Sequence, residues 1–393
     1  MTGVKLIRAF WPLALVLGLL ALAFVLIADP AFPAFRLKSE LKLLPVSPLA
    51  FPFHHEENIP VTIAAGDFNG DGRPDLIVGS VWNNEYSNQI ALFAGKGDGT
   101  FAAPVVTRLN ARPIEVQVAD FNGDGISDVA VISRSQTPGG ENRLRVLTGS
   151  KDGILKSAWM TRLDADPSAL FIADFDGDGK LDLAVSANPY DFVVARGKGD
   201  GKFAEPVRVC QCTVSRVVDL NGDHLPDLVV HNQPYAAVRM NTGNGLFGPP
   251  RRIGRLEFGG RVGAADLNGD GFPDLIFFAN PQTPGITIYS GNGDGTFHAS
   301  GSLIPQEKVS AIRIADLNGD GFPDILATVE RRNTGDLMVF RGVGKGTFGA
   351  PLTIRTGYSR SDIAIADFNL DRQPDVAVSS MGALSVSVFL QSR

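Results

Sequence analysis

Beyond residue 40, apolar residues occur in short runs that are rich in Val, Ile and Leu and are separated by Asp, Asn, Gly and Pro. Residues 312–316, 324–329 and 336–340 show the arrangement: one run leads into an acidic loop, one leaves it, and the third follows a variable loop. A Gly-rich turn and a fourth run complete the unit. Short runs bounded by turn residues indicate β-strands, and no amphipathic helix is predicted after residue 30. The pattern predicts an all-β protein built from four-stranded units.

Each unit is organised around a nine-residue acidic loop, such as residues 266–274, Asp-Leu-Asn-Gly-Asp-Gly-Phe-Pro-Asp. The loop pattern occurs seven times, with copies that start at Asp67, Asp120, Asp174, Asp219, Asp266, Asp316 and Asp367. Successive starts are between 45 (219−174) and 54 (174−120) residues apart. A repeat of about 50 residues predicts a propeller or another repeat array.

The acidic loop is a candidate calcium site because its positions 1, 3, 5 and 9 all carry side-chain oxygen atoms. Calcium is a hard cation that binds roughly six to eight oxygens from carboxylates and carbonyls. A glycine at position 6 allows a positive φ, which lets the position-7 carbonyl face the same centre. These positions hold neither Cys nor His, which argues against zinc. We predict up to seven calcium sites, with these ligands: Asp67, Asn69, Asp71, Asp75, Asp120, Asn122, Asp124, Asp128, Asp174, Asp176, Asp178, Asp182, Asp219, Asn221, Asp223, Asp227, Asp266, Asn268, Asp270, Asp274, Asp316, Asn318, Asp320, Asp324, Asp367, Asn369, Asp371 and Asp375.

The alternative interpretation is that Asp, Asn and Gly are ordinary turn residues. A turn needs neither a third carboxylate nor like charges packed together, so seven copies in register favour metal binding. The third copy is the most acidic, because all four of its ligand positions are Asp. His224 in the fourth copy, and Leu370 and Arg372 in the seventh, replace glycines. A non-Gly residue with positive φ costs about 1 kcal/mol or more, so we predict that these two loops bind calcium most weakly.

Residues 348–351 read Phe-Gly-Ala-Pro, and residues 293–297 followed by 316–324 repeat the Gly-Asp-Gly-Thr-Phe turn and the acidic loop. The chain from about residue 44 to 393 thereby resembles the FG-GAP/VCBS repeat family, which includes the propeller of integrin α chains and secreted propeller lectins. The resemblance implies a seven-bladed β-propeller with calcium in the loop between the first and second strands of each blade. The chain departs from the family at residues 149–155, where the Phe is lost, and at the fourth and seventh acidic loops.

The two ends of the repeat region predict how the ring closes. After Asp375 the seventh repeat supplies only two more runs, at residues 376–380 and 384–390, so it lacks a fourth strand. Residues 44–49 resemble the fourth strand of the first repeat at residues 103–109. We expect this amino-terminal strand to complete the last blade, which leaves no free sheet edge at the seam.

The amino-terminal residues indicate an export signal. Residues 9–28 form an uncharged, predominantly apolar run of 20 residues that follows Lys5 and Arg8. This run is long enough to cross a bilayer, and Leu26 and Ala28 make a poor cleavage site, so an uncleaved signal-anchor is favoured over a signal peptide. We expect residues 1–28 as the signal-anchor or signal peptide, 29–42 as a linker and 43–393 as the propeller. The propeller is expected to be extracytoplasmic, either membrane-anchored or secreted.

Composition narrows the choice of partners. The 393 residues are 44% hydrophobic, enough for a large core, and carry a net charge of −6. The chain shows no basic patch, so nucleic acid is not expected as a partner, and we expect a monomer. For Cys210 and Cys212, packing as two small thiols is favoured over metal binding and redox activity, and a disulfide would require a tight bend between them. Residues 54–57, His-His-Glu-Glu, are interpreted as a solvated connector rather than a second metal site.

The face opposite the acidic loops is the candidate ligand surface. Its loops carry aromatic and polar residues that suit a sugar and equally suit a protein, with these candidates: Trp82, Tyr86, Tyr190, Tyr235, Arg331 and Arg332. We expect a binding or adhesion module for a glycan or protein. An enzyme acting on polysaccharide is the second hypothesis, with candidate carboxylates Glu85, Glu141, Glu257 and Glu330. A structural partner in a cell-envelope complex is the third, since a propeller hosts many functions.

Overall fold

The computed structural model describes residues 42–45, 59–81, 88–137, 139–232, 235–253, 260–278, 284–304, 306–331, 334–356, 362–381 and 385–392. The predicted signal-anchor, the linker up to residue 41 and the His-His-Glu-Glu segment lie outside these ranges, so they stay predictions. Within these ranges no helix is long and apolar enough to span a membrane.

The described strands form seven four-stranded antiparallel sheets, which we number as blades along the chain. Blade 1 contains β2 (Ile59–Gly66), β3 (Asp75–Val81), β4 (Gln89–Phe93) and β5 (Val105–Arg108). Blade 2 contains β6 (Arg112–Ala119), β7 (Asp128–Arg134), β8 (Asn142–Thr148) and β9 (Lys156–Leu163). Blade 3 contains β10 (Asp166–Ala173), β11 (Asp182–Asn188), β12 (Asp191–Ala195) and β13 (Val207–Cys210). Blade 4 contains β14 (Thr213–Val218), β15 (Asp227–Asn232), β16 (Tyr235–Arg239) and β17 (Arg251–Arg252).

Three further sheets complete the set. Blade 5 contains β18 (Arg261–Ala265), β19 (Asp274–Phe278), β20 (Ile286–Gly291) and β21 (Phe297–Leu303). Blade 6 contains β22 (Lys308–Ala315), β23 (Asp324–Arg331), β24 (Thr334–Phe340) and β25 (Leu352–Arg355). Blade 7 contains β26 (Ile363–Ala366), β27 (Asp375–Ser380), β28 (Ser385–Ser392) and β1 (Lys42–Pro45).

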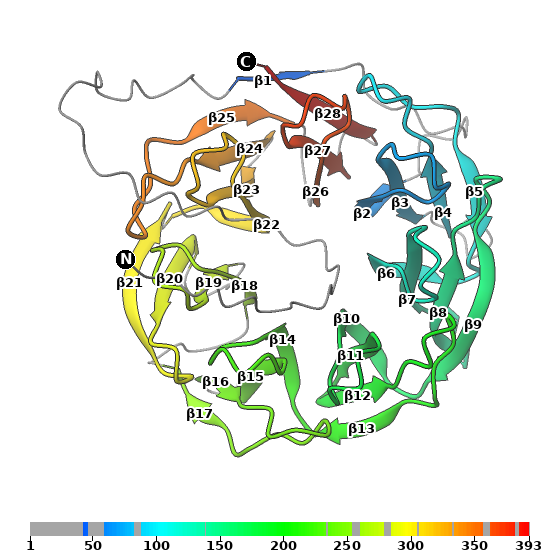
Figure 1. Ribbon diagram of the computed structural model, residues 1–393, viewed down its shortest axis with the longest axis horizontal. Helices are drawn as coiled ribbons and strands as arrows, with labels where there is room; N and C mark the ends of the chain where they lie inside the picture. Colours follow the sequence, from blue (N-terminus) through cyan, green and yellow to red (C-terminus); the bar gives the residue numbers. More distant parts are fainter. Residues whose placement is uncertain are drawn as a thin grey trace, which may run out of the picture. The chain divides into compact units, whose positions relative to one another are not determined.

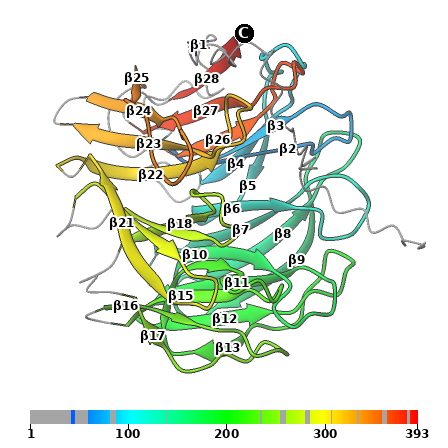
Figure 2. The same cartoon turned by 60° about the vertical axis from the view of Figure 1, so that its left-hand side comes forward.

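The seven sheets are arranged in a ring, as Figure 1 shows, and inner strands of five of them line a cavity at its centre, in the channel of the propeller. The first strand of each blade, from β2 through β26, lies nearest the channel and the fourth lies at the rim. In every blade the acidic loop joins the first strand to the second, so the seven loops share one face of the ring. Figure 2 shows the same ring turned by 60°, with the faces of each sheet toward the neighbouring blades. The predicted seven-bladed propeller of four-stranded blades is confirmed.

The ring closes through the pairing of its two chain ends. Strand β1 pairs antiparallel with β28, with Lys42 opposite Ser392 and Pro45 opposite Phe389. The prediction that an amino-terminal strand completes the last blade is therefore confirmed. The strand begins at Lys42, two residues before the run at residues 44–49 that predicted it. The carboxy-terminal strand β28 gains a partner on its outer edge, so this edge is covered at the seam.

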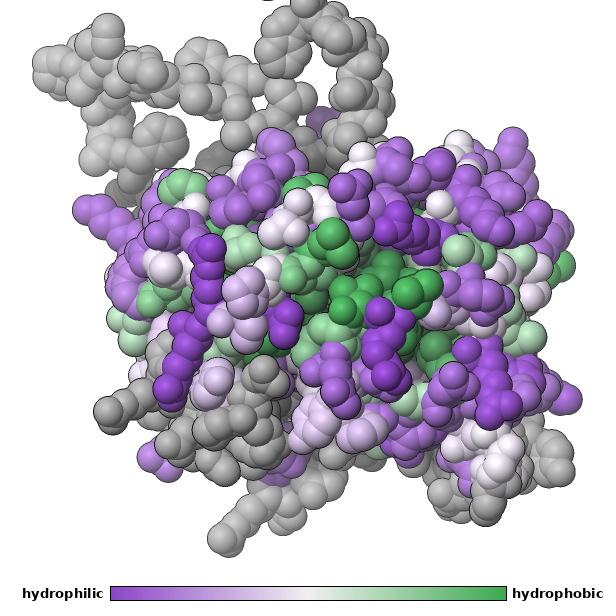
Figure 3. All heavy atoms as spheres, turned by 90° about the horizontal axis from the view of Figure 1, so that it is seen from below, coloured by the Kyte–Doolittle hydropathy of each residue, from purple (hydrophilic) through white to green (hydrophobic). Residues whose placement is uncertain are grey.

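The core lies between the blades, with one cluster of buried apolar side chains at each of the seven blade interfaces. Between blades 2 and 3, for example, Ile132 and Leu144 pack with Leu170 and Val185. Second strands such as β19 and β27 are buried at every position because a blade meets a neighbour on each face. In the side view, apolar residues reach the surface in a recess on the side where β13 and β17 lie, among polar ones (Figure 3).

Candidate functional site

The acidic loops have a common geometry, which the second loop illustrates. Asp120 follows β6, and its Oδ1 accepts hydrogen bonds from the amides of Gly123 (2.7 Å) and Asp124 (3.2 Å). Its Oδ2 accepts the amide of Gly125 at 2.8 Å. The position-5 carboxylate of Asp124 accepts the amide of Ile126 at 2.8 Å. The loop therefore curls around the position-1 carboxylate, and the carboxylates of positions 1 and 5 are oriented by backbone amides of the loop.

Asparagine at position 3 organises the same loop. In the second loop, Asn122 Oδ1 accepts the amide of Asp124 at 2.9 Å, and Asn122 Nδ2 donates to Asp124 Oδ2 at 3.0 Å. The same amide-to-carboxylate bond recurs in the other five loops that carry Asn, from residues 69, 221, 268, 318 and 369. A neutral amide group thus contacts one oxygen of the position-5 carboxylate in six loops.

The third loop differs because position 3 is Asp176, which cannot donate such a bond. Ligand oxygens of Asp174, Asp176 and Asp182 all lie within 4.8 Å of one another. Arg196 forms an ion pair with Asp176 and hydrogen-bonds the carbonyl of Asn244 at 3.0 Å. Three converging carboxylates are a donor set that suits a hard cation such as calcium. Among the described residues, this loop therefore fits the predicted metal best.

The position-9 aspartates are buried, with at most 1% of each residue exposed. Asp128 begins β7; its Oδ2 accepts the amide of Phe121 at 3.0 Å and its Oδ1 accepts the amide of Gly149 at 2.9 Å. The same pair of bonds occurs in all seven blades and ties the loop to the exit of the third strand. Burial raises the pKa of Asp128 to about 6, although the hydrogen bonds from the two amides act in the opposite direction. Position 9 is therefore a structural clamp as well as a predicted ligand.

Position 2 of the loop carries a role that sequence reasoning missed. Its side chain is buried in every copy: Phe68, Phe121, Phe175, Leu220, Leu267, Leu317 and Phe368. Its carbonyl accepts a bond from the next blade at several interfaces, such as Gly201 N to Phe121 O (3.1 Å) and Gly346 N to Leu267 O (3.0 Å). The invariably apolar residue after the first Asp was the signal that could have revealed this contact. The acidic loop thereby joins adjacent blades.

The substituted loops keep the backbone of the others. His224 has φ 67°, Leu370 has φ 60° and Arg372 has φ 68°, the region that Gly70 and Gly72 occupy in the first loop. The amides of His224 and Arg372 still donate to the position-1 carboxylate, His224 N to Asp219 Oδ2 at 2.8 Å and Arg372 N to Asp367 Oδ2 at 2.7 Å. The residues that were predicted to strain these loops therefore do sit in the left-handed region. Their weaker calcium binding stays a prediction.

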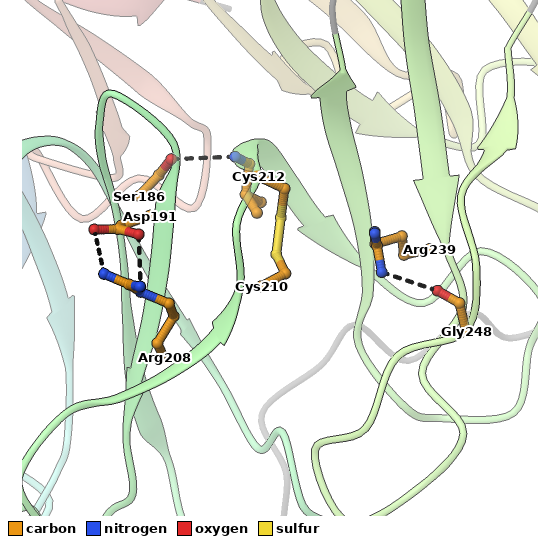
Figure 4. Close-up of a disulfide and its surroundings, with 8 residues drawn as sticks. Ser186, Asp191, Arg208, Cys210, Cys212, Arg239 and Gly248 are labelled. Atoms are coloured by element: carbon orange, nitrogen blue, oxygen red, sulfur yellow. Dashed lines mark hydrogen bonds and ion pairs between the residues drawn. A yellow bond between two sulfur atoms is a disulfide. The ribbon is translucent and has the colours of Figure 1, made fainter.

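The interpretation of Cys210 and Cys212 as thiols is wrong, because the two form a disulfide with Cα atoms 5.4 Å apart. Cys210 ends β13, Cys212 precedes β14, and the chain bends at Gln211 and Cys212. This bend between blades 3 and 4 brings together two side chains that a continuous strand would hold apart. Figure 4 shows the disulfide near the two-bonded ion pair of Arg208 with Asp191.

The candidate ligand residues occupy several blades. Tyr190 lies in the turn between β11 and β12 and is 43% exposed. Tyr235 begins β16 and packs on the core between blades 3 and 4. The guanidinium carbon of Arg252 lies over its ring, at a distance of 4.6 Å from the ring centre. Arg331 ends β23 and forms ion pairs with Glu307 and Asp336 at 3.0 and 3.1 Å. Trp82, Tyr86 and Arg332 lie outside the described residues.

The carboxylates of the enzyme hypothesis are not brought together where they are described. Glu141 precedes β8 in blade 2 and pairs with Arg143 and Arg162. Glu330 lies in β23 of blade 6 and pairs with Lys308. Glu85 and Glu257 lie outside the described residues. Each of the two described glutamates is engaged in its own blade, so they form no acid–base pair with each other.

The fold and the loops define the class of this protein. It is a repeat propeller of seven blades, and each blade has an acidic loop between its first two strands. The model of the FG-GAP-like repeat matches residues 67–131, 120–185, 219–277, 266–327 and 316–378. These segments cover well over half of the chain. The chain belongs to the FG-GAP-like repeat family, and the resemblance noted in the sequence is confirmed.

Individual relatives are more distant. Linkin from Caenorhabditis elegans is 27% identical over an alignment of 193 positions, and the match covers 42% of this chain and 31% of linkin. The chain thus spans just under a third of that protein. A lectin from Agrocybe aegerita, whose structure describes recognition of non-reducing terminal N-acetylglucosamine, aligns with a TM-score of 0.56 at 22% identity over 83% of this chain and 86% of the lectin chain. A chain of the BBS1N–ARL6DN complex aligns with a TM-score of 0.60 at 10% identity over 90% and 98%. The structural likenesses show the shared fold.

Proposed function

We propose that this chain is a calcium-stabilised binding module that recognises a glycan or a protein on the face opposite its acidic loops. The convergence of Asp174, Asp176 and Asp182 in the third loop carries the calcium part of the proposal. Calcium there would be held by the side-chain oxygens of positions 1, 3 and 9, together with the carboxylate of Asp178 at position 5. The ion would offset the repulsion between these carboxylates and so stabilise the folded loop.

The ligand-binding part rests on the turn between β11 and β12. Asn188, Pro189 and Tyr190 are all exposed there, on a hairpin held by the buried strand β11. An aromatic face beside a side-chain amide suits the apolar C–H surface and hydroxyls of a sugar. The shared fold with a lectin that recognises N-acetylglucosamine supports a glycan as the first candidate.

An extracytoplasmic location is part of this proposal. The apolar run at residues 9–28 supports export, and the Cys210–Cys212 disulfide supports an oxidising compartment. Calcium is available there for loops that bind it weakly. The run would anchor the propeller if it is not cleaved.

The test is a glycan array probed with the full chain, in calcium and again in a chelator. Binding of a defined sugar that is lost on Tyr190→Ala or Asn188→Ala would support the proposal. Phe272→Ala is the matched control, since Phe272 is an exposed aromatic residue on the acidic-loop face. Folded, calcium-loaded protein that binds no glycan would overturn the glycan candidate, and a pull-down from envelope extracts would then test a protein ligand.

A further inference from the structure

The central channel contains a cavity of about 450 Å³ between the inner strands of blades 2 to 6. Four charged residues line it: Glu115 of β6, Arg216 of β14, Arg261 of β18 and Arg313 of β22. The volume lies within the range of roughly 300–1,000 Å³ that is usual for small-molecule sites. None of the residues that line the cavity belongs to an acidic loop, so the cavity is a separate candidate site.

The carboxylates near the cavity are already engaged by hydrogen-bond donors. Asp362 Oδ1 accepts Arg313 Nη2 at 2.8 Å, and Asp362 Oδ2 accepts the amide of Ile63 at 3.2 Å. Glu115 Oε1 accepts Gln117 Nε2 at 2.8 Å, and Glu115 Oε2 accepts the amide of Leu170 at 3.1 Å.

The amide of Leu170 is available because β10 is the inner edge strand of its sheet, where alternate amides point away from β11. Glu115 therefore has a structural role, since it joins blade 2 to blade 3. The carboxylate of Asp362 likewise joins blade 7 to blade 1, and it neutralises one arginine, Arg313.

Arg216 and Arg261 are the other two arginines that line the cavity. Neither has a hydrogen bond or ion pair with any residue in the described part of the chain. They come from the inner strands of adjacent blades, β14 and β18. Desolvation in the channel lowers the pKa of Arg216 although the residue is exposed, the positive charge of Arg313 lowers it further, and the negative charge of Glu115 opposes both effects. The lining thus holds three arginines against one glutamate, Glu115, and this excess of positive charge favours an anion in the cavity.

We propose that the channel binds a small oxyanion, a carboxylate or a phosphate group, through Arg216 and Arg261. Guanidinium groups hold such planar or tetrahedral oxyanions with charge-assisted hydrogen bonds, often two at a time. Gln117, Thr213 and Ser215 also line the cavity and supply neutral polar groups around the anion. This site shares no residue with the acidic loops or with the Tyr190 turn, so its test does not depend on the proposed function.

The experiment is isothermal titration of the full chain in calcium with methyl phosphate and with glucuronate, at constant ionic strength. Glucose serves as the neutral control for glucuronate. Constant ionic strength keeps general screening unchanged between additions. Four variants are compared by circular dichroism and titration: Arg216→Gln, Arg261→Gln, Glu115→Gln and Arg162→Gln. Arg162 is an exposed arginine of β9 outside the channel, and it controls for the loss of one positive charge.

We expect one site that binds at least one of the two anions and does not bind glucose. Arg216→Gln and Arg261→Gln should each weaken binding about tenfold or more, the loss expected for one charge-assisted contact. Glu115→Gln should tighten binding because it removes a competing negative charge, and Arg162→Gln should leave it unchanged. Binding of only one anion supports the proposal and identifies the group.

Either of two results would overturn the inference. One is folded wild-type protein that binds neither anion at millimolar concentration. The other is binding that persists unchanged in both channel arginine variants. If those two variants fail to fold, the tighter binding expected of Glu115→Gln decides the question, because unchanged or weaker binding by that variant contradicts the proposal.

Discussion

The amide of Gly99 donates a hydrogen bond of 2.9 Å to the carbonyl oxygen of Phe368, and so joins the turn of blade 1 to the acidic loop of blade 7. The two residues are adjacent only because the ring closes. The ring of Phe368 also packs edge-on against Phe101, with centroids 5.6 Å apart. The acidic loop thus has three structural tasks: it turns the chain, anchors the blade through its buried position-9 carboxylate, and contacts the next blade through position 2.

Removal of a position-9 carboxylate should destabilise the protein far more than removal of a position-5 carboxylate. Asp128→Ala leaves the buried amides of Phe121 and Gly149 without acceptors, at a cost of about 1–3 kcal/mol for each group. Asp124→Ala is the matched control, because Asp124 is exposed and water replaces its bonds. Urea denaturation in chelator measures both free energies of unfolding without a metal contribution. Equal losses in the two variants would contradict the clamp.

Replacement of a non-glycine residue that has a positive φ by glycine should stabilise the seventh acidic loop. Arg372→Gly removes a side chain from a position with φ 68° and is expected to raise the free energy of unfolding by up to about 1 kcal/mol. The reverse substitution, Gly321→Arg at the same place in the sixth loop, should lower it, since Gly321 has φ 87°. A Cβ atom added at Gly321 would meet nothing within 4 Å, so the backbone alone carries this cost. Thermal and urea melts of the pair check the opposite signs, and changes of the same sign in both would refute the explanation.

The sequence predicted the repeated parts of the molecule well, because each repeat encodes its own turn. The spacing of Asp120 and Asp128 was enough to predict a loop between two strands, and Leu370 and Arg372 were recognised as left-handed from the register alone. The charged lining of the channel could not be predicted. Arg216 and Arg261 lie 45 residues apart (261−216) in unrelated local contexts, and only closure of the ring brings them to one cavity. The Cys210–Cys212 bond likewise depends on a bend between blades.

Acidification should destabilise the interface between blades 4 and 5 through His231. Its Nε2 lies 2.9 Å from the carbonyl of Gly260, and burial lowers its pKa below the ordinary value of 6.5. Because the unfolded chain takes up the proton more readily, the stability that neutral His231 contributes is present above about pH 6.5 and is lost as the pH falls through the folded pKa. Wild type should therefore lose stability relative to His231→Gln between about pH 8 and pH 5. A difference between the two proteins that is constant over this range would contradict the assignment.

The disulfide should be present yet contribute little to stability. Cys210 and Cys212 are two residues apart in sequence, so the closed loop is very short. The loop-entropy relation gives about 1–2 kcal/mol for such a loop. The double substitution Cys210→Ser, Cys212→Ser should reduce the free energy of unfolding by no more than this amount. Thiol labelling of unreduced, unfolded protein tests the bond itself: two reactive thiols would show that it is absent.

The measurement that tests the central claim most directly is thermal unfolding of the full chain in calcium and in chelator. Metal that binds only the folded state stabilises it by mass action, so the melting temperature should rise with calcium concentration. Magnesium should have a smaller effect, because it gives up its water ligands reluctantly. Replacement of Asp176 by Ala should reduce the calcium-dependent rise. An identical melting temperature in calcium and in chelator, for protein shown to start loaded with calcium, would contradict the account of the acidic loops as calcium sites.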